Sequence, residues 1–227
     1  MNIVAFFSQL ACSFGLCLDD TPEPKLKVSV YYETLCPHSI KFIRDQLYPV
    51  YEELREYLEL DLVPYGNAET IRHPNGTVQF WCQHGTSECF GNTVHACAIS
   101  LLAPEVSAFF IYCTMYQRPP SLAGSFCAKE LNITFAPIRN CARSNEGKRL
   151  HERNGNRTAA LVPYQKWVPW ITFNDGWDEN DDGLSSVNFL AVVCKHLRAT
   201  QPSALETGLT MTEDQNRVKY LKACGRL

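Results

Sequence analysis

The spacing of apolar residues in the first third of the chain predicts a strand, a helix and a second strand. Residues 26–32 alternate well enough for a strand, and residues 59–65 form another short apolar run. Between them, apolar residues recur at helical spacing at Ile40, Ile43, Leu47, Val50 and Leu54. Two strands joined by a helix are expected to pair in parallel through a right-handed crossover. Pro49 lies inside this helix and predicts a kink or a break near Tyr48.

The middle of the chain is predicted to be largely helical. Residues 77–81 have the pattern of a short strand, and residues 88–116 are apolar at helical spacing, with Pro104 dividing them into two helices. A third helix is expected over roughly 136–152. We interpret residues 82–155 as a helical insertion. A separate small domain is the less favoured alternative, because the segments on either side need each other to complete a sheet.

The last third supplies a strand and a closing helix. Residues 167–173 predict the third strand, and residues 184–199 predict an amphipathic helix. The apolar positions of this helix are Val187, Leu190, Val193, Cys194 and Leu197. The pattern as a whole predicts one α/β domain over residues 19–199, followed by a polar C-terminal tail over residues 200–227.

The N-terminal residues 1–18 have the pattern of a signal peptide. They are mostly apolar with small residues near the end, although no basic side chain precedes the apolar run. Cleavage is expected between Ser13 and Asp20. A membrane anchor or a buried strand is the alternative, but the run is short of the roughly 20 apolar residues that a spanning helix needs. No membrane span is expected after cleavage.

Composition indicates a secretory protein. The formal charge of −3 over 227 residues gives no electrostatic reason to expect nucleic acid or an anionic membrane as a partner. The 11 cysteines are typical of an oxidising compartment. Three glycosylation sequons agree with that route, and they begin at Asn75, Asn132 and Asn156.

The number of cysteines indicates one unpaired thiol. Cys12 and Cys17 would leave with a signal peptide, and nine cysteines would then remain. An odd count leaves at least one thiol unpaired, and Cys36 is the natural candidate. The other eight would form up to four bridges of open connectivity: Cys82, Cys89, Cys97, Cys113, Cys127, Cys141, Cys194 and Cys224. Cleavage before Cys17 would remove this parity argument.

The candidate chemistry lies at Cys36. It follows the first predicted strand and precedes the first predicted helix, which is where thioredoxin-like proteins keep their reactive thiol. Pro37 suits the first helical position, and the free N–H groups and dipole of the helix favour a thiolate. His38, if protonated or donating, would favour it further. The usual motif is Cys-x-x-Cys, but Ser39 stands in place of the second cysteine.

A proline begins the third predicted strand. Pro169 lies in the run 167–173, and a proline at the start of an otherwise strong strand has positional meaning. In thioredoxin-like folds the corresponding proline is cis and lies against the active-site cysteine. Pro169 is therefore a candidate site residue, and a plain strand-edge proline is the alternative.

Residues 82–97 resemble a known family. They read Cys-Gln-His-Gly-Thr-Ser-Glu-Cys-Phe-Gly-Asn-Thr-Val-His-Ala-Cys and fit Cys-Gln-His-Gly-x2-Glu-Cys-x2-Asn-x4-Cys at every fixed position. This is similar to the signature of the gamma-interferon-inducible lysosomal thiol reductase (GILT) family. Residues 31–37, 64–68 and 168–172 also resemble this family, so the likeness covers roughly residues 26–198.

The resemblance implies a fold and an activity. The fold would be thioredoxin-like with a disulfide-rich helical insertion, in a secreted or lysosomal protein. The activity would be reduction of protein disulfides at acidic pH, without a bound cofactor. Family reductases use a Cys-x-x-Cys pair, and this chain departs from them at Ser39.

Metal binding is the competing interpretation of two stretches. A zinc cluster could be drawn from Cys82, His84, Cys89, His95 and Cys97, but the spacings do not follow the usual pairs, so disulfides are expected. Residues 178–183 match the first half of a calcium loop. The twelfth position is Phe189, where a Glu is required, so an acidic surface loop is expected. No metal is predicted. The remaining histidines, expected to be surface or packing residues, are His73, His151 and His196.

Two functions follow from one thiol. The first is a monothiol disulfide reductase or isomerase, in which Cys36 attacks a disulfide-containing protein substrate. An external thiol such as cysteine or glutathione would then resolve the mixed disulfide, because Ser39 has no thiol. The second is a binding module that keeps the fold without redox turnover, and holds partners non-covalently or as mixed disulfides.

Overall fold

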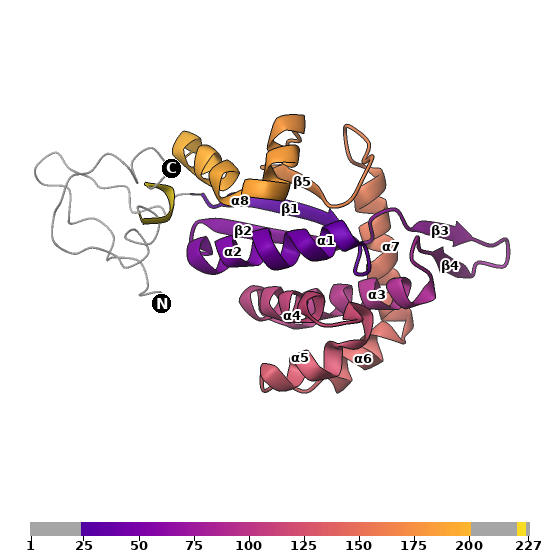
Figure 1. The fold of residues 1–227 in the computed structure, drawn as a ribbon. Helices are drawn as coiled ribbons and strands as arrows, with labels where there is room; N and C mark the ends of the chain where they lie inside the picture. Colours follow the sequence, from indigo (N-terminus) through magenta and orange to yellow (C-terminus); the bar gives the residue numbers. More distant parts are fainter. Residues whose placement is uncertain (1–23, 201–221, 226–227) are drawn as a thin grey trace, which may run out of the picture.

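The computed structural model describes residues 24–200 and 222–225, and Figure 1 shows their arrangement. The predicted leader and most of the tail lie outside the described residues. The main sheet has three strands in the order β2-β1-β5. β1 (Leu26–Tyr32) pairs in parallel with β2 (Leu58–Pro64) and antiparallel with β5 (Trp170–Phe173). The predicted strand–helix–strand unit is therefore present, with β1 at its centre.

β1 is buried on both faces because it is the central strand. Six of its seven residues are buried, which is typical of a strand covered by helices on both sides. In register, Val30 lies opposite Leu62 of β2 and Ile171 of β5. Cys36 follows the end of this strand, so the most constrained strand of the sheet leads directly to the thiol.

The helix after Cys36 continues through its internal proline. It consists of α1 (Pro37–Phe42), a π-helical turn η1 (Ile43–Leu47) and α2 (Tyr48–Leu54). Pro49 has no N–H to donate to the carbonyl of Asp45, and the π-helical turn η1 lies just before it, on its N-terminal side. The expected irregularity near Tyr48 is thus a π-helical widening with no gap in the helix.

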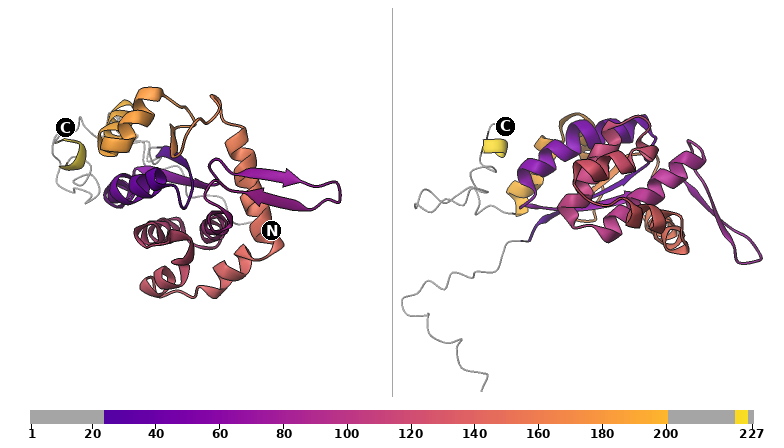
Figure 2. Two further views of the ribbon diagram at one scale, coloured as in Figure 1. Left: turned by 45° about the vertical axis from the view of Figure 1, so that its right-hand side comes forward. Right: turned by 90° about the horizontal axis from the view of Figure 1, so that it is seen from below.

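Five helices and a hairpin lie between β2 and β5. The hairpin pairs β3 (Glu69–Arg72) with β4 (Val78–Trp81) and projects from the body of the molecule (Figure 2). The helices are α3 (Thr86–Leu101), α4 (Pro104–Tyr116), α5 (Gly124–Glu130), α6 (Ala136–Ala142) and α7 (Asn145–Ala159), with a short 3-10 turn η2 (Pro120–Leu122) before α5. The helix predicted over 136–152 is two helices, because Ser144 caps a new one by accepting a hydrogen bond from the Glu146 N–H.

The closing helix α8 (Glu179–Thr200) is interrupted at Asn188, whose φ of −149° and ψ of 68° are not helical. The side chain of Gln46 accepts the Phe189 N–H that the interruption leaves free, at 3.1 Å. Val187 was predicted on the apolar face, and this was wrong: it is 70% exposed. The interruption places Phe189 in the core instead, whereas Val193 and Leu197 are buried there as predicted.

One apolar core connects the sheet to the helices. It contains Val30 of β1, Phe110 of α4, Leu150 of α7 and Leu197 of α8. In Figures 1 and 2, α8 lies on the opposite side of the β1–α2 layer from α4 and α5. Among the described residues, no helix has the length and apolar character needed to cross a membrane.

Four disulfides join parts of the described chain. They are Cys82–Cys89, Cys97–Cys141, Cys113–Cys127 and Cys194–Cys224. The second and third join helices within the α3–α7 block, and the fourth joins α8 to the described residues near the C-terminus. These cross-links stabilise the helices that surround the sheet and leave the sheet itself without a covalent tie.

Gly91 should be required for packing between α3 and the segment before Cys36. A Cβ there would lie 2.6 Å from Thr34 Oγ1 and 3.1 Å from Ser121 Cα. We expect Gly91→Ala to lower the free energy of unfolding by about 1–3 kcal/mol in urea denaturation, despite the better helix propensity of Ala. Gly183→Ala in α8 is the matched control, because a Cβ there meets nothing within 4 Å. Equal stability of the two variants would contradict the prediction.

Candidate functional site

Cys36 is the only free cysteine among the described residues. It is the N-cap residue of α1, and its side chain caps none of the helix N–H groups. The thiol is buried, with the residue 6% exposed, and its Sγ donates to the carbonyl oxygen of Val168 at 3.9 Å. The Val168–Pro169 peptide bond that follows is cis. The sulfur therefore lies between a helix N-terminus and the cis-proline segment before β5.

The three residues after Cys36 differ in exposure. Pro37 and His38 are exposed, whereas Ser39 is fully buried. Ser39 Oγ accepts the backbone N–H of Glu33 at 3.4 Å. The hydroxyl at the position of the usual second cysteine thus points into the protein, toward the segment before Cys36. A substrate can reach the site from the side of Pro37 and His38.

Helix α3 holds the segment that leads to Cys36. The Thr34 N–H donates to Asn92 Oδ1 at 2.9 Å, and the Leu35 N–H donates to Glu88 Oε2 at 3.2 Å. The Thr34 hydroxyl also donates to the Glu88 carbonyl oxygen at 3.3 Å. Glu88 and Asn92 are four residues apart on one helix face and are fixed positions of the 82–97 pattern. Sequence reasoning missed both as site residues, although their helical spacing within the pattern was a usable signal.

Two buried carboxylates and one imidazole lie beside this segment. His84 Nδ1 is 2.6 Å from Glu88 Oε2 and 3.4 Å from Glu33 Oε2, and both carboxylates are fully buried. Glu33 Oε1 accepts the Asn67 N–H at 2.6 Å, whereas Glu33 Oε2 has no hydrogen-bond partner. The Glu33 side chain also contacts Gly66 closely: a Cβ there would lie 2.3 Å from Glu33 Cγ.

The environment raises the pKa of Glu33 from 4.5 to about 7. Burial is the largest cause and the neighbouring Glu88 carboxylate is the second, while the Asn67 N–H and His84 oppose the shift. One oxygen from each of Glu33 and Glu88 and a ring nitrogen of His84 lie within 4.8 Å of one another, which is close enough to hold a cation.

The zinc cluster considered from the sequence is absent from the described residues. Cys82, Cys89 and Cys97 are all in disulfides. His95 is buried away from them in α3, where Nδ1 meets the Tyr32 hydroxyl at 2.9 Å and Nε2 meets Thr114 Oγ1 at 2.8 Å. Burial lowers the pKa of His95 to about 3. The residues of the 82–97 pattern therefore position α3 and cross-link it through disulfides.

The acidic stretch 178–183 is not a surface loop, and the sequence interpretation was wrong here. Asp181 and Asp182 are 5% and 3% exposed at the start of α8. Asp182 accepts the Trp167 indole N–H at 2.7 Å and the Ile171 N–H at 2.9 Å. These two donors flank Pro169, so Asp182 fixes the segment that covers the Cys36 sulfur.

Asp181 is the second buried carboxylate at the start of α8. It accepts from Lys195 Nζ at 2.7 Å and lies 2.8 Å from His196 Nε2. Of the other two histidines expected at the surface or in packing, His73 is exposed and His151 is fully buried.

The three sequon asparagines are exposed. Asn75 lies in the β3–β4 turn, Asn132 follows α5, and Asn156 lies within α7. Each is open to modification from solvent in this structure.

Comparison with known sequences identifies relatives of similar length. The sequence model of the family "Gamma interferon inducible lysosomal thiol reductase (GILT)" matches residues 27–131. A gamma-interferon-inducible lysosomal thiol reductase-like protein of Anopheles gambiae is 37% identical over 190 residues, covering 77% of this chain and 78% of the relative. The mouse gamma-interferon-inducible lysosomal thiol reductase is 32% identical over 182 residues, covering 79% of this chain and 71% of the relative.

Comparison with solved structures confirms the predicted thioredoxin-like fold. The crystal structure of DsbA from Chlamydia trachomatis superposes with a TM-score of 0.53 at 14% identity, covering 78% of this chain and 87% of that chain. The fold is thus of the DsbA type, a thioredoxin-like α/β core with inserted helices.

Glu33 should make stability depend on pH. Between pH 4.5 and about 7, folded Glu33 keeps a proton that the unfolded chain has released, so its contribution to stability falls as pH rises. We expect the free energy of unfolding of wild type minus that of Glu33→Gln to fall by about 1–3 kcal/mol from pH 5 to pH 7.5 in urea denaturation. The difference cancels the opposite contributions of the buried histidines. A difference that stays constant with pH would contradict the role of Glu33.

Proposed function

Because the chain belongs to the gamma-interferon-inducible lysosomal thiol reductase family, we propose that it is a thiol–disulfide oxidoreductase that acts through the single thiol of Cys36. The observation that carries this proposal is the position of that thiol. Cys36 is unpaired, whereas the other eight described cysteines are in disulfides. Its sulfur lies at the N-terminus of α1 and against the carbonyl before cis-Pro169.

The helix N-terminus supports formation of the thiolate. Free N–H groups and the positive end of the helix dipole stabilise a negative sulfur. No side chain caps α1, so nothing in this segment competes with Cys36 for these N–H groups. His38 is exposed beside the thiol and adds a positive charge when it is protonated. Burial of the sulfur and its contact with Val168 mean that a substrate must displace that contact to be attacked.

The first step needs only this thiolate. The Cys36 sulfur attacks one sulfur of a substrate disulfide, forms a mixed disulfide, and releases the other substrate sulfur as a thiolate. The substrates are disulfide-containing proteins. No electrons are gained or lost overall in this exchange, and no bound cofactor is required.

The second step needs a thiol from outside the chain. Ser39 cannot form a disulfide, and its hydroxyl is buried and accepts the Glu33 N–H. An external thiol such as cysteine or glutathione therefore attacks the mixed disulfide at the Cys36 sulfur. It becomes disulfide-bonded to Cys36, and the substrate leaves with a second free thiol. A second external thiol then restores the Cys36 thiolate, so the two-electron reductant is a pair of small thiols.

We propose a lysosomal or secreted setting. The four disulfides are typical of an oxidising route of synthesis, and the three sequon asparagines are accessible for glycosylation. The relatives of fish and mouse are named as lysosomal thiol reductases. The signal peptide predicted over residues 1–18 fits the same route.

Reductase activity should depend on Cys36 and be limited by residue 39. With insulin as substrate and cysteine as the external thiol, we expect Cys36→Ser to reduce the rate to the background of cysteine alone. Ser39→Cys supplies a resolving thiol in the chain and should raise the rate at low external thiol by on the order of tenfold. The double variant Cys36→Ser/Ser39→Cys is the control and should stay at background. Wild-type activity equal to that of Cys36→Ser would exclude the monothiol reductase.

A second candidate function is supported by the burial of Ser39. Without a resolver, a mixed disulfide can be long-lived, and the protein would act as a trap or as a non-covalent binding module. After thiol blocking and non-reducing electrophoresis, a trap should show adducts in wild type that are absent in Cys36→Ser and depleted in Ser39→Cys. Equal recovery of partners by wild type and Cys36→Ser would favour non-covalent binding, and would contradict trapping.

A further inference from the structure

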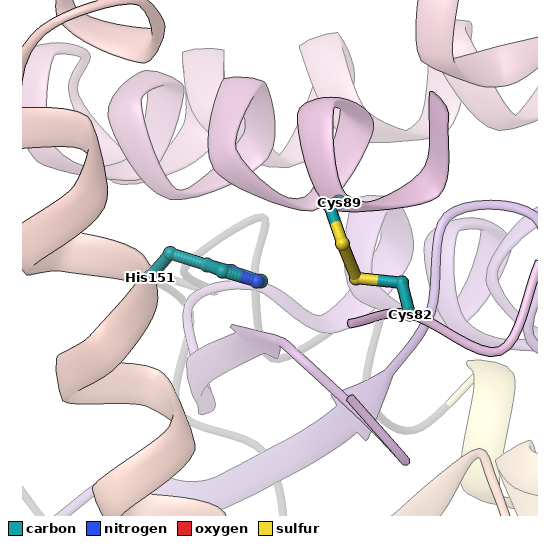
Figure 3. A group of neighbouring side chains, drawn as sticks. All are labelled: Cys82, Cys89 and His151. Carbon is teal, nitrogen blue, oxygen red and sulfur yellow. A yellow bond between two sulfur atoms is a disulfide. The ribbon is translucent and has the colours of Figure 1, made fainter. Parts of the chain in front are cut away.

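A second group of sulfur and nitrogen ligands lies apart from Cys36. Figure 3 shows the ring of His151, on α7, pointing toward the disulfide between Cys82 and Cys89. One ligand atom from each of these three residues lies within 4.8 Å of the others. Cys82 precedes α3 and Cys89 lies on it, so three segments of the chain converge on this point.

His151 has no ordinary structural partner in the described residues. It is 0% exposed, and neither of its ring nitrogens has a hydrogen-bond partner of ordinary distance and angle, although the Pro64 carbonyl lies close enough to influence its pKa. The rings of Tyr65 and Phe80 pack against it at centroid distances of 5.0 and 4.5 Å. A buried polar group without a partner costs free energy, so an imidazole here calls for an explanation that a Phe or Leu would not.

Burial also keeps this imidazole neutral. Desolvation lowers the pKa of His151 to about 4, and the Pro64 carbonyl opposes the shift only partly. A neutral imidazole has one nitrogen lone pair, which is the form that binds metals.

We propose that reduction of the Cys82–Cys89 disulfide opens a zinc site made of two thiolates and the imidazole of His151. Two molecules of a small thiol reduce the disulfide to two cysteine thiols and leave as one oxidised disulfide. Zinc then binds as the two thiols release their protons. The redox state of this one bridge therefore decides whether the chain can hold the metal.

The distances fit this ligand set. Bonds of about 2.3 Å to sulfur and about 2.0 Å to nitrogen place tetrahedral zinc ligands about 3.5–3.8 Å apart. The two sulfurs are 2.06 Å apart in the disulfide and separate when it opens, while the present spread of ligand atoms is at most 4.8 Å. Adjustments on the order of 1 Å complete the site.

Charge and access fit as well. Two thiolates and a neutral imidazole balance the charge of Zn²⁺, which suits the aromatic surroundings of His151. Cys82 is 3% exposed, whereas Cys89 is only half-buried, so a small thiol and a water molecule as fourth ligand can enter on the Cys89 side.

The test uses cobalt as the probe in the full chain carrying Cys36→Ser, which removes the free thiol as a ligand. Graded dithiothreitol is applied, peptide mapping after alkylation shows which bridges are open, and circular dichroism shows that the chain stays folded. We expect the oxidised chain to show no thiolate-to-cobalt charge-transfer absorption. Once Cys82 and Cys89 are free, it should bind one Co²⁺ per chain with thiolate-to-cobalt charge-transfer absorption. Zn²⁺ added as the only other metal should displace the bound cobalt.

Variants separate this site from other thiols. His151→Leu should weaken cobalt binding at least about tenfold, and His151→Asn provides the same comparison if the Leu variant fails to fold. Cys113→Ala/Cys127→Ala is the matched control and should bind as before, because its bridge is not part of this group. The proposal would be overturned if a folded chain with Cys82 and Cys89 free bound no cobalt. It would also be overturned if both His151 variants bound cobalt as tightly as the chain that keeps His151.

Discussion

The backbone N–H groups of Thr34 and Leu35 impose the constraint on which the site depends. β1 ends at Tyr32, so these buried donors have no strand to pair with and need side-chain acceptors. Asn92 and Glu88 of α3 supply them. The sulfur of Cys36 is therefore positioned by a helix that follows it by some fifty residues. The inserted helix α3 therefore positions the segment before Cys36 as well as covering the core.

One of these two acceptors is a carboxyl group. Glu88 is fully buried, and His84 at 2.6 Å offsets the cost of burying it. Glu33 is buried next to the same imidazole with one oxygen unpaired, and its raised pKa follows from that crowding. The segment that leads to the thiol thus lies against one carboxyl group, that of Glu33, whose protonation changes between acidic and neutral pH. An amide at position 33 would accept the Asn67 N–H without this dependence.

Local features of the site were predictable from sequence, and tertiary ones were not. Cys36 and Pro169 could be found because a strand–helix junction and a proline at the start of a strand each have local meaning. The contact between them needed the fold. In the sequence, Asp182 stands beside four other polar residues and was therefore expected to be exposed to solvent. In the structure, it lies at the start of α8 and accepts hydrogen bonds from the donors that flank Pro169. His151 has no sequence pattern at all, because its neighbours come from three separate segments. The prediction that Val187 is buried was wrong for a related reason. Helical periodicity assumes a continuous helix, and Asn188 interrupts α8.

The disulfides are distributed unevenly over the described residues. Within the described residues, the bridges tie helix to helix or close a local loop, and none joins β1 to the segment 160–173. The half that carries the sulfur is held by hydrogen bonds to side chains of α3, whereas the half that carries Val168 is held by four residue pairs between β1 and β5 and by Asp182. No disulfide among the described residues therefore joins the half that carries the sulfur to the half that carries Val168. A bulky polypeptide could part the two without any covalent bond in the scaffold having to yield.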